Sequence, residues 1–301
     1  MKHTIGVSVC IFTYNYEKFL NQAIDSVLAQ ETGFPVEIVI GDDCSTDATR
    51  SVAAAYRDRY PDRIVLSFNE TNIGGTRNWI KTINRCSGKY IALLDGDDYF
   101  TDNRKLQKLY DALEGNPDYV LGFHGVEEKY DDITGKDKIV VYDKEEYDLS
   151  DFLRQGWFIR TGATFFRNDI LPKEPPAWVF DFPYRYDTIL HVFLCMHGKA
   201  VCLKDVMSVW RKHSKGMSFV LLENRVRNGL AEIRLARQLN EYTGKKYSRA
   251  ARSYMAESYT YLFLNILKSK KMFQYGTILT ASLLRMNYKL FFRLFRQKLA
   301  A

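Results

Sequence analysis

The stretch Leu93-Leu94-Asp95-Gly96-Asp97-Asp98 places three carboxylates within four residues, directly after the apolar run Tyr90 to Leu94. Like charges this close raise one another's pKa unless a cation is shared, so the cluster predicts a bound divalent metal ion. Oxygen ligands suit Mg²⁺ or Mn²⁺, and Mg²⁺ is usually held by one or two carboxylates together with substrate phosphates. The alternative interpretation is a solvated turn with Asp-Gly at its centre.

Around this stretch, apolar runs alternate with segments of helical period, which predicts successive βα units and a mostly parallel sheet. Ser45 is expected to cap a helix that ends near Tyr60, before Pro61. The other expected elements are strands at 7–12, 36–40, 64–68, 90–94 and 119–125, helices at 17–30, 103–114 and 187–195, a helix ending near 87–88, a charged loop at 127–138 and a hairpin near 139–142.

The length and composition fit a cytoplasmic globular protein. The chain has 301 residues, 46% of them hydrophobic, and its five cysteines are scattered without a CxxC pair, which indicates a reducing compartment and no disulfide framework. The N-terminus does not read as a signal peptide, and no run of about 18 apolar residues predicts a transmembrane helix.

The net charge of +7 conceals an asymmetry between two predicted domains, 1–217 and 218–301. Residues 1–203 carry 23 Lys and Arg against 31 Asp and Glu, giving −8, whereas residues 204–301 carry 20 against 5, giving +15. From Ser218 the pattern is helical, with breaks expected near 243–244, 269 and 287. Basic amphipathic helices in 250–301 predict contact with an anionic membrane surface, hence peripheral attachment to the inner face of the cell membrane. Alternatively, these apolar stripes pack on the domain or in a homo-oligomer.

Four segments in order resemble glycosyltransferase family 2: Val7 to Asn15, Glu37 to Asp47, Asn72-Ile73-Gly74 and Tyr90 to Asp98. The similarity spans about residues 5 to 215. It implies an α/β fold of the GT-A type, a Rossmann-like, mostly parallel sheet flanked by helices, here with a C-terminal helical extension. It also implies inverting transfer of a sugar from a nucleotide-diphosphate sugar, which is the donor substrate. The implied cofactor is Mn²⁺ or Mg²⁺.

The resemblance also implies roles for residues at the first strand ends. Thr13 and Tyr14 would line the base pocket, Asp43 would accept a hydrogen bond from the base edge, and Arg77 would lie near the donor nucleotide. Asp43 as a loop acid at a helix start and Arg77 in a surface salt bridge are the alternatives. Cys44 stands where the family commonly has Gly.

In the acid cluster, the resemblance implies that one carboxylate contacts the ribose and another the metal bridging the diphosphate. Asp95 and Asp97 are the predicted donor contacts, and Asp97, Asp98 and His213 are the predicted metal ligands. His213 follows Trp210-Arg211-Lys212, and a surface histidine is the alternative. The metal would neutralise charge on the departing nucleoside diphosphate.

Inverting transfer needs a base that removes the acceptor hydroxyl proton, and Asp187 is the candidate. The family often has Glu-Asp at this place, whereas Tyr186 precedes Asp187 here. Asp181 is therefore a rival, and a helix N-cap is the alternative role for Asp187.

Two other classes compete with this interpretation. Gly96-Asp97-Asp98 also looks like a polymerase palm motif, but it ends a run of βα units, and a sugar nucleotidyltransferase would need a Gly-rich phosphate loop. A catalytically inactive membrane-surface protein is the non-enzyme alternative. The processive Gln-x-x-Arg-Trp signature is absent, which favours single-sugar transfer, with a UDP-sugar as donor and a glycan or lipid-linked acceptor in cell-surface polysaccharide synthesis. No nucleic acid partner is expected.

Overall fold

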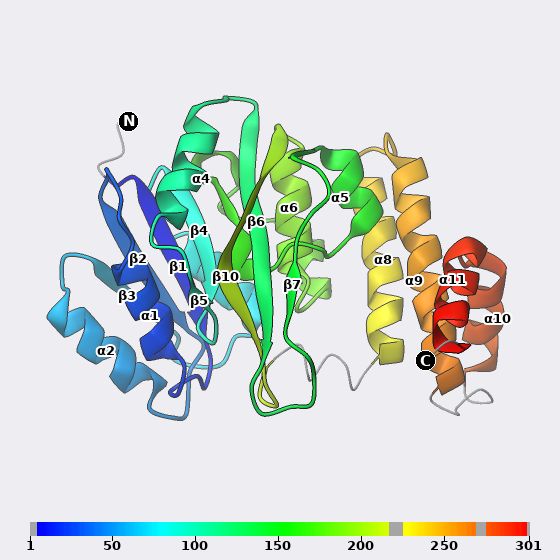
Figure 1. Ribbon diagram of the computed structural model, residues 1–301, viewed down its shortest axis with the longest axis horizontal. Coiled ribbons are helices and arrows are strands. Elements are labelled where there is room, and N and C mark those ends of the chain that lie inside the picture. Colours follow the sequence, from blue (N-terminus) through cyan, green and yellow to red (C-terminus); the bar gives the residue numbers. More distant parts are fainter. Residues whose placement is uncertain (1–4, 217–224, 269–274, 300–301) are drawn as a thin grey trace. The chain divides into compact units, whose positions relative to one another are not determined.

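A computed structural model describes residues 5–216, 225–268 and 275–299 of the chain (Figure 1). The chain divides into two compact units. The first comprises Met1–Leu149 with Ile159–Gly216, and the second comprises Ser150–Phe158 with Met217–Ala301. The sequence had not indicated that residues 150–158 belong with the C-terminal helices.

The first unit is built on a ten-stranded mixed sheet with the order β3-β2-β1-β4-β9-β6-β10-β5, in which β7 pairs with β6 and β8 with β10. The pairs β1–β2, β1–β4, β2–β3 and β6–β10 are parallel. The strands are β1 (Val7–Thr13), β2 (Val36–Asp42), β3 (Ile64–Phe68), β4 (Tyr90–Asp95), β5 (Tyr99–Phe100), β6 (Tyr119–Tyr130), β7 (Lys138–Val140), β8 (Glu146–Tyr147), β9 (Phe165–Arg167) and β10 (Lys199–Lys212).

Helices cover both faces of this sheet, because alternate residues of each strand point to opposite faces. On β1, Val7, Val9 and Ile11 share one core cluster with apolar residues of α1, α2 and α4. On the other face, Phe12 stacks on Trp79 of α3. The helices are α1 (Leu20–Leu28), α2 (Thr49–Arg59), α3 (Gly75–Ile83), α4 (Lys105–Glu114) and α6 (Tyr186–Cys195), with 3₁₀ turns η1 (Thr161–Ala163), η2 (Asn168–Ile170) and η3 (Ala177–Asp181).

The βα units of the first hundred residues are confirmed, but the cap predicted for α2 is wrong. The Ser45 hydroxyl donates to the carboxylate of Asp42 instead of capping the helix. The helix begins four residues later, where Asp47 Oδ1 accepts the backbone N–H of Thr49 at 3.0 Å. The prediction failed because the Ser45 hydroxyl is hydrogen-bonded to Asp42 and does not reach the start of the helix.

Strand β6 is longer than the sequence predicted. Residues 127–130, expected in a loop, continue β6 because they pair with residues 209–212 of β10, a strand of 14 residues. The one buried charge among them, that of Glu128, has two cationic partners. Glu128 is buried, and its carboxylate accepts from Arg160 at 2.7 Å and lies 3.1 Å from Lys138.

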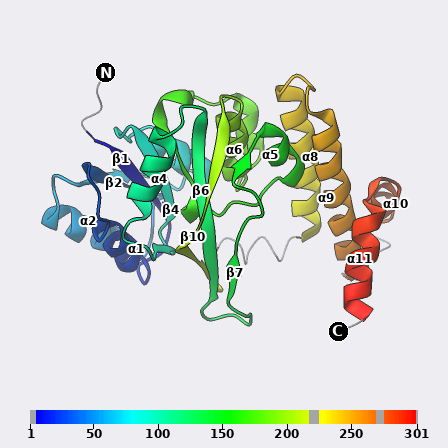
Figure 2. The same cartoon turned by 45° about the horizontal axis from the view of Figure 1, so that its top comes forward.

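The second unit is helical in its described part, with α5 (Leu149–Gln155), α8 (Arg225–Tyr242), α9 (Ser248–Lys268), α10 (Gly276–Arg285) and α11 (Tyr288–Leu299) (Figures 1 and 2). The breaks expected near 243–244 and 287 are confirmed, whereas the one near 269 lies outside the described residues. Ile233, Leu262 and Ile266 form the buried centre of α8 and α9. Across 225–268 and 275–299, as in the first unit, the helices are too short or too polar to span a bilayer.

Candidate functional site

Several of the predicted site residues lie at the carboxyl ends of the three parallel strands β1, β2 and β4. Thr13 of β1 pairs with Asp42 of β2, and Phe12 pairs with Asp95 of β4, so these ends meet at one edge of the sheet. Gly96 allows the close approach of the two chains: its N–H donates to Phe12 O at 2.7 Å, and an added Cβ would lie 3.0 Å from that oxygen. This edge is where ligands bind in open α/β sheets.

The three acids at the end of β4 influence one another's protonation. Burial raises the pKa of Asp95 to about 8, with further increases from the charges of Asp97 and Asp187 against a hydrogen bond from Thr161 that lowers it. Burial, followed by the charges of Asp97 and Asp95, raises the pKa of Asp98 well above its usual range. Simultaneous ionisation of all three acids is therefore unfavourable in the surroundings that the protein alone provides.

His213 brings an imidazole into contact with this cluster. Its Nε2 lies 2.9 Å from Oδ2 of Asp97, and both side chains are buried. The ring is held from one side by Phe19, at 4.6 Å between ring centroids. Beside it, burial and the three carboxylates raise the pKa of the Tyr16 hydroxyl well above its usual range. His213 is thus part of the acid cluster and not an isolated surface residue.

Arg211 is the principal site residue that sequence reasoning missed. Its backbone N–H donates to Asp98 Oδ1 at 2.8 Å, and its Nε donates to the carbonyl of Asp97 at 2.8 Å. Its two terminal nitrogens reach Asp131 at 2.7 Å and Gln22 at 2.6 Å. A single buried guanidinium therefore ties the acid motif to α1 and to the loop after β6. Sequence reasoning noted Arg211 only as a neighbour of His213, because none of these partners is near it in the chain.

Asp187 lies in the first turn of α6, and its charge raises the pKa of Asp95. The structure thus brings the predicted base within electrostatic reach of the acid cluster. Its own Oδ1 accepts the backbone N–H of Thr188 at 2.7 Å. The rival, Asp181, is exposed at the end of η3. The choice of Asp187 as the base, with Asp181 as its rival, stays a prediction.

The donor set fits a divalent cation that is only partly coordinated by protein. No group of three or more His, Cys, Asp or Glu side chains within 5–216, 225–268 and 275–299 is arranged to hold a metal ion alone. Asp97 and His213 form a two-residue donor pair, and Oδ1 of Asp98 is already occupied by Arg211. Mg²⁺ and Mn²⁺ commonly complete such a set with substrate phosphate and water.

Asp43 lies at the end of β2, buried under the loop that follows β3. Its Oδ1 accepts the backbone N–H of Ile73 at 2.8 Å and the side-chain amide of Asn69 at 3.1 Å, and its Oδ2 accepts the N–H of Gly74 at 2.9 Å. The carboxylate therefore fixes the start of α3. Contact with a nucleobase stays a prediction, and any such contact would use the remaining lone pairs.

The other residues expected near the nucleotide differ in exposure. Thr13 is buried, and in the part of the chain that the structure describes its Oγ1 has no hydrogen-bond partner. Tyr14 is exposed, and the exposed Arg77 places its guanidinium 4.1 Å from the ring centroid of Phe180. Cys44 adopts a left-handed backbone with φ of +63°, which explains why glycine is favoured at this position.

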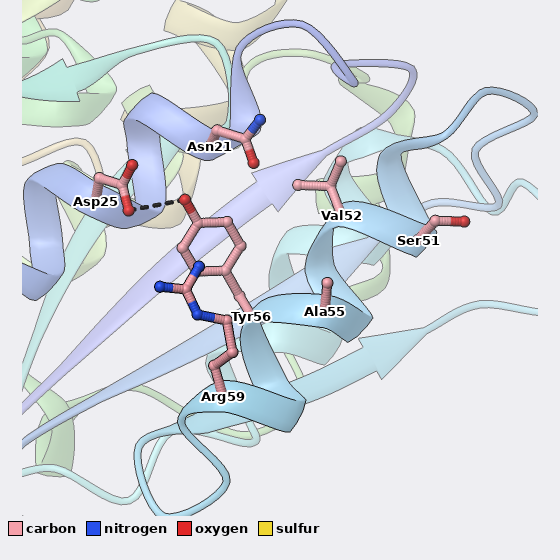
Figure 3. Close-up of a pocket in the computed structure, with 7 residues that line it drawn as sticks. All are labelled: Asn21, Asp25, Ser51, Val52, Ala55, Tyr56 and Arg59. Carbon is pink, nitrogen blue, oxygen red and sulfur yellow. Dashed lines mark hydrogen bonds between the residues drawn. The ribbon is translucent and has the colours of Figure 1, made fainter.

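A separate hollow of about 630 Å³ lies between α1 and α2 (Figure 3). The Tyr56 hydroxyl donates to Asp25 at 2.7 Å there, and the guanidinium of Arg59 lies 5.6 Å from the Tyr56 ring centroid. Its lining residues are Asn21, Asp25, Ser51, Val52, Ala55, Tyr56 and Arg59. None of them belongs to the acid cluster or to the predicted nucleotide site.

Comparison with known proteins assigns this constellation to a family. The sequence profile of glycosyl transferase family 2 matches residues 8–171, more than half of the chain. The chain belongs to this family. An uncharacterized protein of Mycobacterium tuberculosis strain H37Rv is 35% identical over 212 residues, which cover 70% of this chain and 60% of the relative. This chain thus spans about three fifths of the length of that family member.

A second relative in the family has a more informative name. The putative teichuronic acid biosynthesis glycosyltransferase TuaG of Bacillus subtilis is 31% identical over 134 residues, or 44% of this chain and 52% of that protein. The family assignment agrees with the motifs at the ends of β1, β2 and β4.

Solved structures identify the fold as GT-A. TarS 1–349 of S. aureus in complex with UDP matches with a TM-score of 0.61 and 18% identity, over 89% of this chain and 74% of that one. A mannosyltransferase of Pyrobaculum calidifontis in complex with GDP-Man and Mn²⁺ matches with a TM-score of 0.55 and 15% identity, over 92% and 79%. The predicted fold class is confirmed.

Proposed function

We propose that this protein is an inverting, metal-dependent glycosyltransferase that moves one sugar from a nucleotide-diphosphate sugar to an acceptor hydroxyl. One observation carries the proposal: Asp95, Asp97 and Asp98 converge with His213, and the charge of Asp187 reaches Asp95, at the strand edge of a GT-A fold. Family membership adds independent support.

In this proposal Asp97 and His213 hold the metal ion, with Asp98 as a further candidate ligand. The bound ion would neutralise charge that develops on the leaving nucleoside diphosphate. Asp187 accepts the proton of the acceptor hydroxyl, a step typically worth about 10²- to 10⁴-fold in rate. Asp95 is coupled to both the proposed metal ligand and the proposed base, because the charges of Asp97 and Asp187 both raise its pKa.

The donor is proposed to be a UDP-sugar, held by Thr13, Tyr14, Asp43, Arg77, Asp95 and Asp97. A structural neighbour that binds UDP favours this base. The neighbour that binds GDP-Man and Mn²⁺ makes a guanosine donor the second candidate and manganese a suitable cation.

The acceptor is proposed to be a growing cell-surface polysaccharide or its lipid-linked precursor. The name of the Bacillus subtilis relative, which refers to teichuronic acid biosynthesis, supports a polysaccharide acceptor. A lipid-linked acceptor would be presented at the cytoplasmic face of the membrane, and peripheral attachment there would bring the enzyme to it. The basic character of the C-terminal third is compatible with such a location.

A polymerase-like function is disfavoured by the surroundings of the acid motif. β4 pairs in parallel with β1 on one side and antiparallel with the short β9 on the other. A palm motif would instead lie in the turn of an antiparallel hairpin. A protein that only binds nucleotides or membranes differs from the proposed enzyme in turnover, so the experiment must measure transfer.

The test is incubation of the full chain with a panel of UDP-, GDP- and dTDP-sugars, with Mn²⁺ or with EDTA, and with synthetic glycan and lipid-linked acceptors. We expect metal-dependent release of one nucleoside diphosphate and a product whose anomeric configuration, measured by NMR, is opposite to that of the donor. A product of retained configuration would overturn the inverting mechanism. Absence of both turnover and metal-dependent nucleotide binding across the panel would overturn the enzyme assignment.

A further inference from the structure

Two neighbouring helices of the second unit expose an unusual number of large apolar side chains. Leu283 and Leu284 at the end of α10 are 42% and 70% exposed, and Tyr288 and Phe292 of α11 are 49% and 56% exposed. We call these four residues, with Lys289 and Arg293, the α10–α11 face. The Tyr288 hydroxyl donates to the carbonyl of Leu283 at 2.6 Å, so the exposed ends of the two helices lie side by side. Neighbouring exposed apolar groups usually mark a contact surface.

The exposure is not a failure of these helices to pack. The side chains of Ser282 on α10, Met286 just after α10 and Leu290 on α11 are buried. The ring of Phe291 lies 5.8 Å from that of Phe263 on α9. One side of the pair thus already contacts its own unit. The α10–α11 face is on the opposite side of these helices. The helices therefore carry apolar side chains on both their buried and their exposed sides.

The arrangement of α11 places apolar and basic side chains in two adjacent rows. Tyr288 and Phe292 are four residues apart and so follow one another along the helix surface, and Lys289 and Arg293 repeat the same spacing one position later. All four are exposed. An aromatic row beside a cationic row is the pattern of a helix that lies in a membrane interface, with rings between the acyl chains and cations at the headgroups.

The positive charge of the surrounding sequence favours a negatively charged partner for this face. Residues 258–301 contain eight Lys and Arg and no Asp or Glu. A second copy of the same face would bring like charges together, because a symmetric contact places equivalent patches against each other. An anionic lipid surface would instead attract these cations while accepting the rings.

We infer that the α10–α11 face docks on an anionic lipid surface, with Leu284, Tyr288 and Phe292 inserted between headgroups and Lys289 and Arg293 bound to lipid phosphates. This contact needs neither donor nor metal. It deepens the proposed function only in placing the enzyme beside a lipid-linked acceptor, and it can be measured without sugar transfer.

The experiment is co-sedimentation of the full-length protein with vesicles of phosphatidylcholine, with and without phosphatidylglycerol. We expect binding to the anionic vesicles alone, weakened by salt. Lys289→Gln with Arg293→Gln should weaken it about 30-fold, since each basic residue near such a surface contributes roughly a factor of five to six. Leu284→Ser with Phe292→Ser should also weaken it, and circular dichroism should show that the helices persist because these side chains are exposed.

The matched control removes the same charge elsewhere in the second unit. Lys246 and Arg252 are exposed at the turn between α8 and α9 and at the start of α9, and Lys246→Gln with Arg252→Gln should bind nearly as the wild type. Equal losses in the two charge variants would overturn the assignment of the face. So would absent vesicle binding accompanied by concentration-dependent dimers in light scattering. Asp187→Asn should bind vesicles normally, which separates failure of docking from failure of the proposed catalysis.

Discussion

His213 Nε2 lies 2.9 Å from Asp97 Oδ2, although the two residues are 116 positions apart in the chain. The contact follows from strand pairing. β5 directly follows the acid motif and runs antiparallel to β10, with Tyr99 opposite Val209. The residues just before β5 therefore meet the residues just after Val209. The guanidinium of Arg211, which contacts the acid motif, comes from β10, the last strand along the chain. The imidazole comes from His213, the residue that follows β10.

Removal of the imidazole should weaken metal binding. We expect His213→Ala to lower the affinity for Mn²⁺ in the presence of UDP by at least about 10- to 100-fold, a loss typical even of groups that only support a metal ligand. Isothermal titration calorimetry with Mn²⁺ measures this. His197→Ala, which changes an exposed histidine in the turn after α6, is the control. Equal Mn²⁺ affinities in wild type and His213→Ala would exclude His213 as a ligand.

Exchange of the proposed base should affect turnover more than donor binding. Asp187→Asn keeps the shape of the side chain but cannot accept the hydroxyl proton, so kcat should fall by about 10²- to 10⁴-fold with little change in donor KM. Asp181→Asn is the matched control, because this exposed carboxylate lies close in sequence but does not act on Asp95. If Asp181→Asn shows the larger loss, the assignment of the two acids must be exchanged.

Arg211 should support both the fold and the metal site. Arg211→Met leaves the carbonyl of Asp97 without its side-chain donor, whereas Asp131 and Gln22 are exposed and can be hydrated. We therefore expect the free energy of unfolding to fall by about 1 to 3 kcal/mol. Arg211→Lys keeps the charge but not the fork of donors, so it should retain more stability while still weakening UDP binding in Mn²⁺. Urea denaturation and nucleotide titration measure the two effects.

The control for Arg211 is Arg57→Met, which removes an exposed ion pair with Asp58. Its effect on the free energy of unfolding should stay within about 1 kcal/mol. A similarly small effect of Arg211→Met would show that the three side-chain hydrogen bonds of Arg211 are not needed for stability.

The carboxylate of Asp43 should stabilise the loop before α3 even without a nucleotide. Asp43→Asn turns an amide group toward one of the two backbone N–H donors, which should lower the free energy of unfolding by about 1 to 3 kcal/mol. Urea denaturation of the nucleotide-free protein measures this. Loss of nucleotide affinity at unchanged stability would instead assign the carboxylate to base recognition alone.

His191 should make stability depend on pH. Burial lowers its pKa to about 3 in the folded state, whereas the unfolded chain titrates near 6.5. Between these values the unfolded state binds the additional proton, so stability is lost as the pH falls, by about 1.4 kcal/mol per pH unit. The loss between about pH 7 and pH 5 should be about 2 kcal/mol greater in wild type than in His191→Gln, measured by urea denaturation. Identical pH dependence in both proteins would contradict this assignment.

The sequence predicted the first four βα units because each strand is a short apolar run followed by residues of helical period. Predictions from local sequence were wrong where a side chain outside the local pattern forms the deciding contact. Ser45 looked like a helix cap, but the carboxylate of Asp42 takes its hydroxyl. Residues 127–130 looked like a charged loop, but Glu128 is neutralised by Arg160, which lies 32 residues away, and the strand continues.

The candidate site shows the same division. Asp95, Asp97 and Asp98 could be found from spacing alone, because carboxylates crowded at the end of an apolar strand repel one another unless they share a cation. The grouping of Arg211 with Asp131 and Gln22 could not, since their positions are up to 189 residues apart and no local pattern links them. The resemblance to a family supplied His213 and Asp187, and the fold places both near the acids.

The position of Arg211 and His213 at the end of β10 has a consequence for protein synthesis. A ribosome that has released only the first 198 residues has already made β1 to β9, including the whole acid motif. That nascent chain has its carboxylates but neither the guanidinium nor the imidazole that accompany them. In the proposed role of these residues, a prematurely terminated polypeptide should therefore bind manganese more weakly than the complete chain.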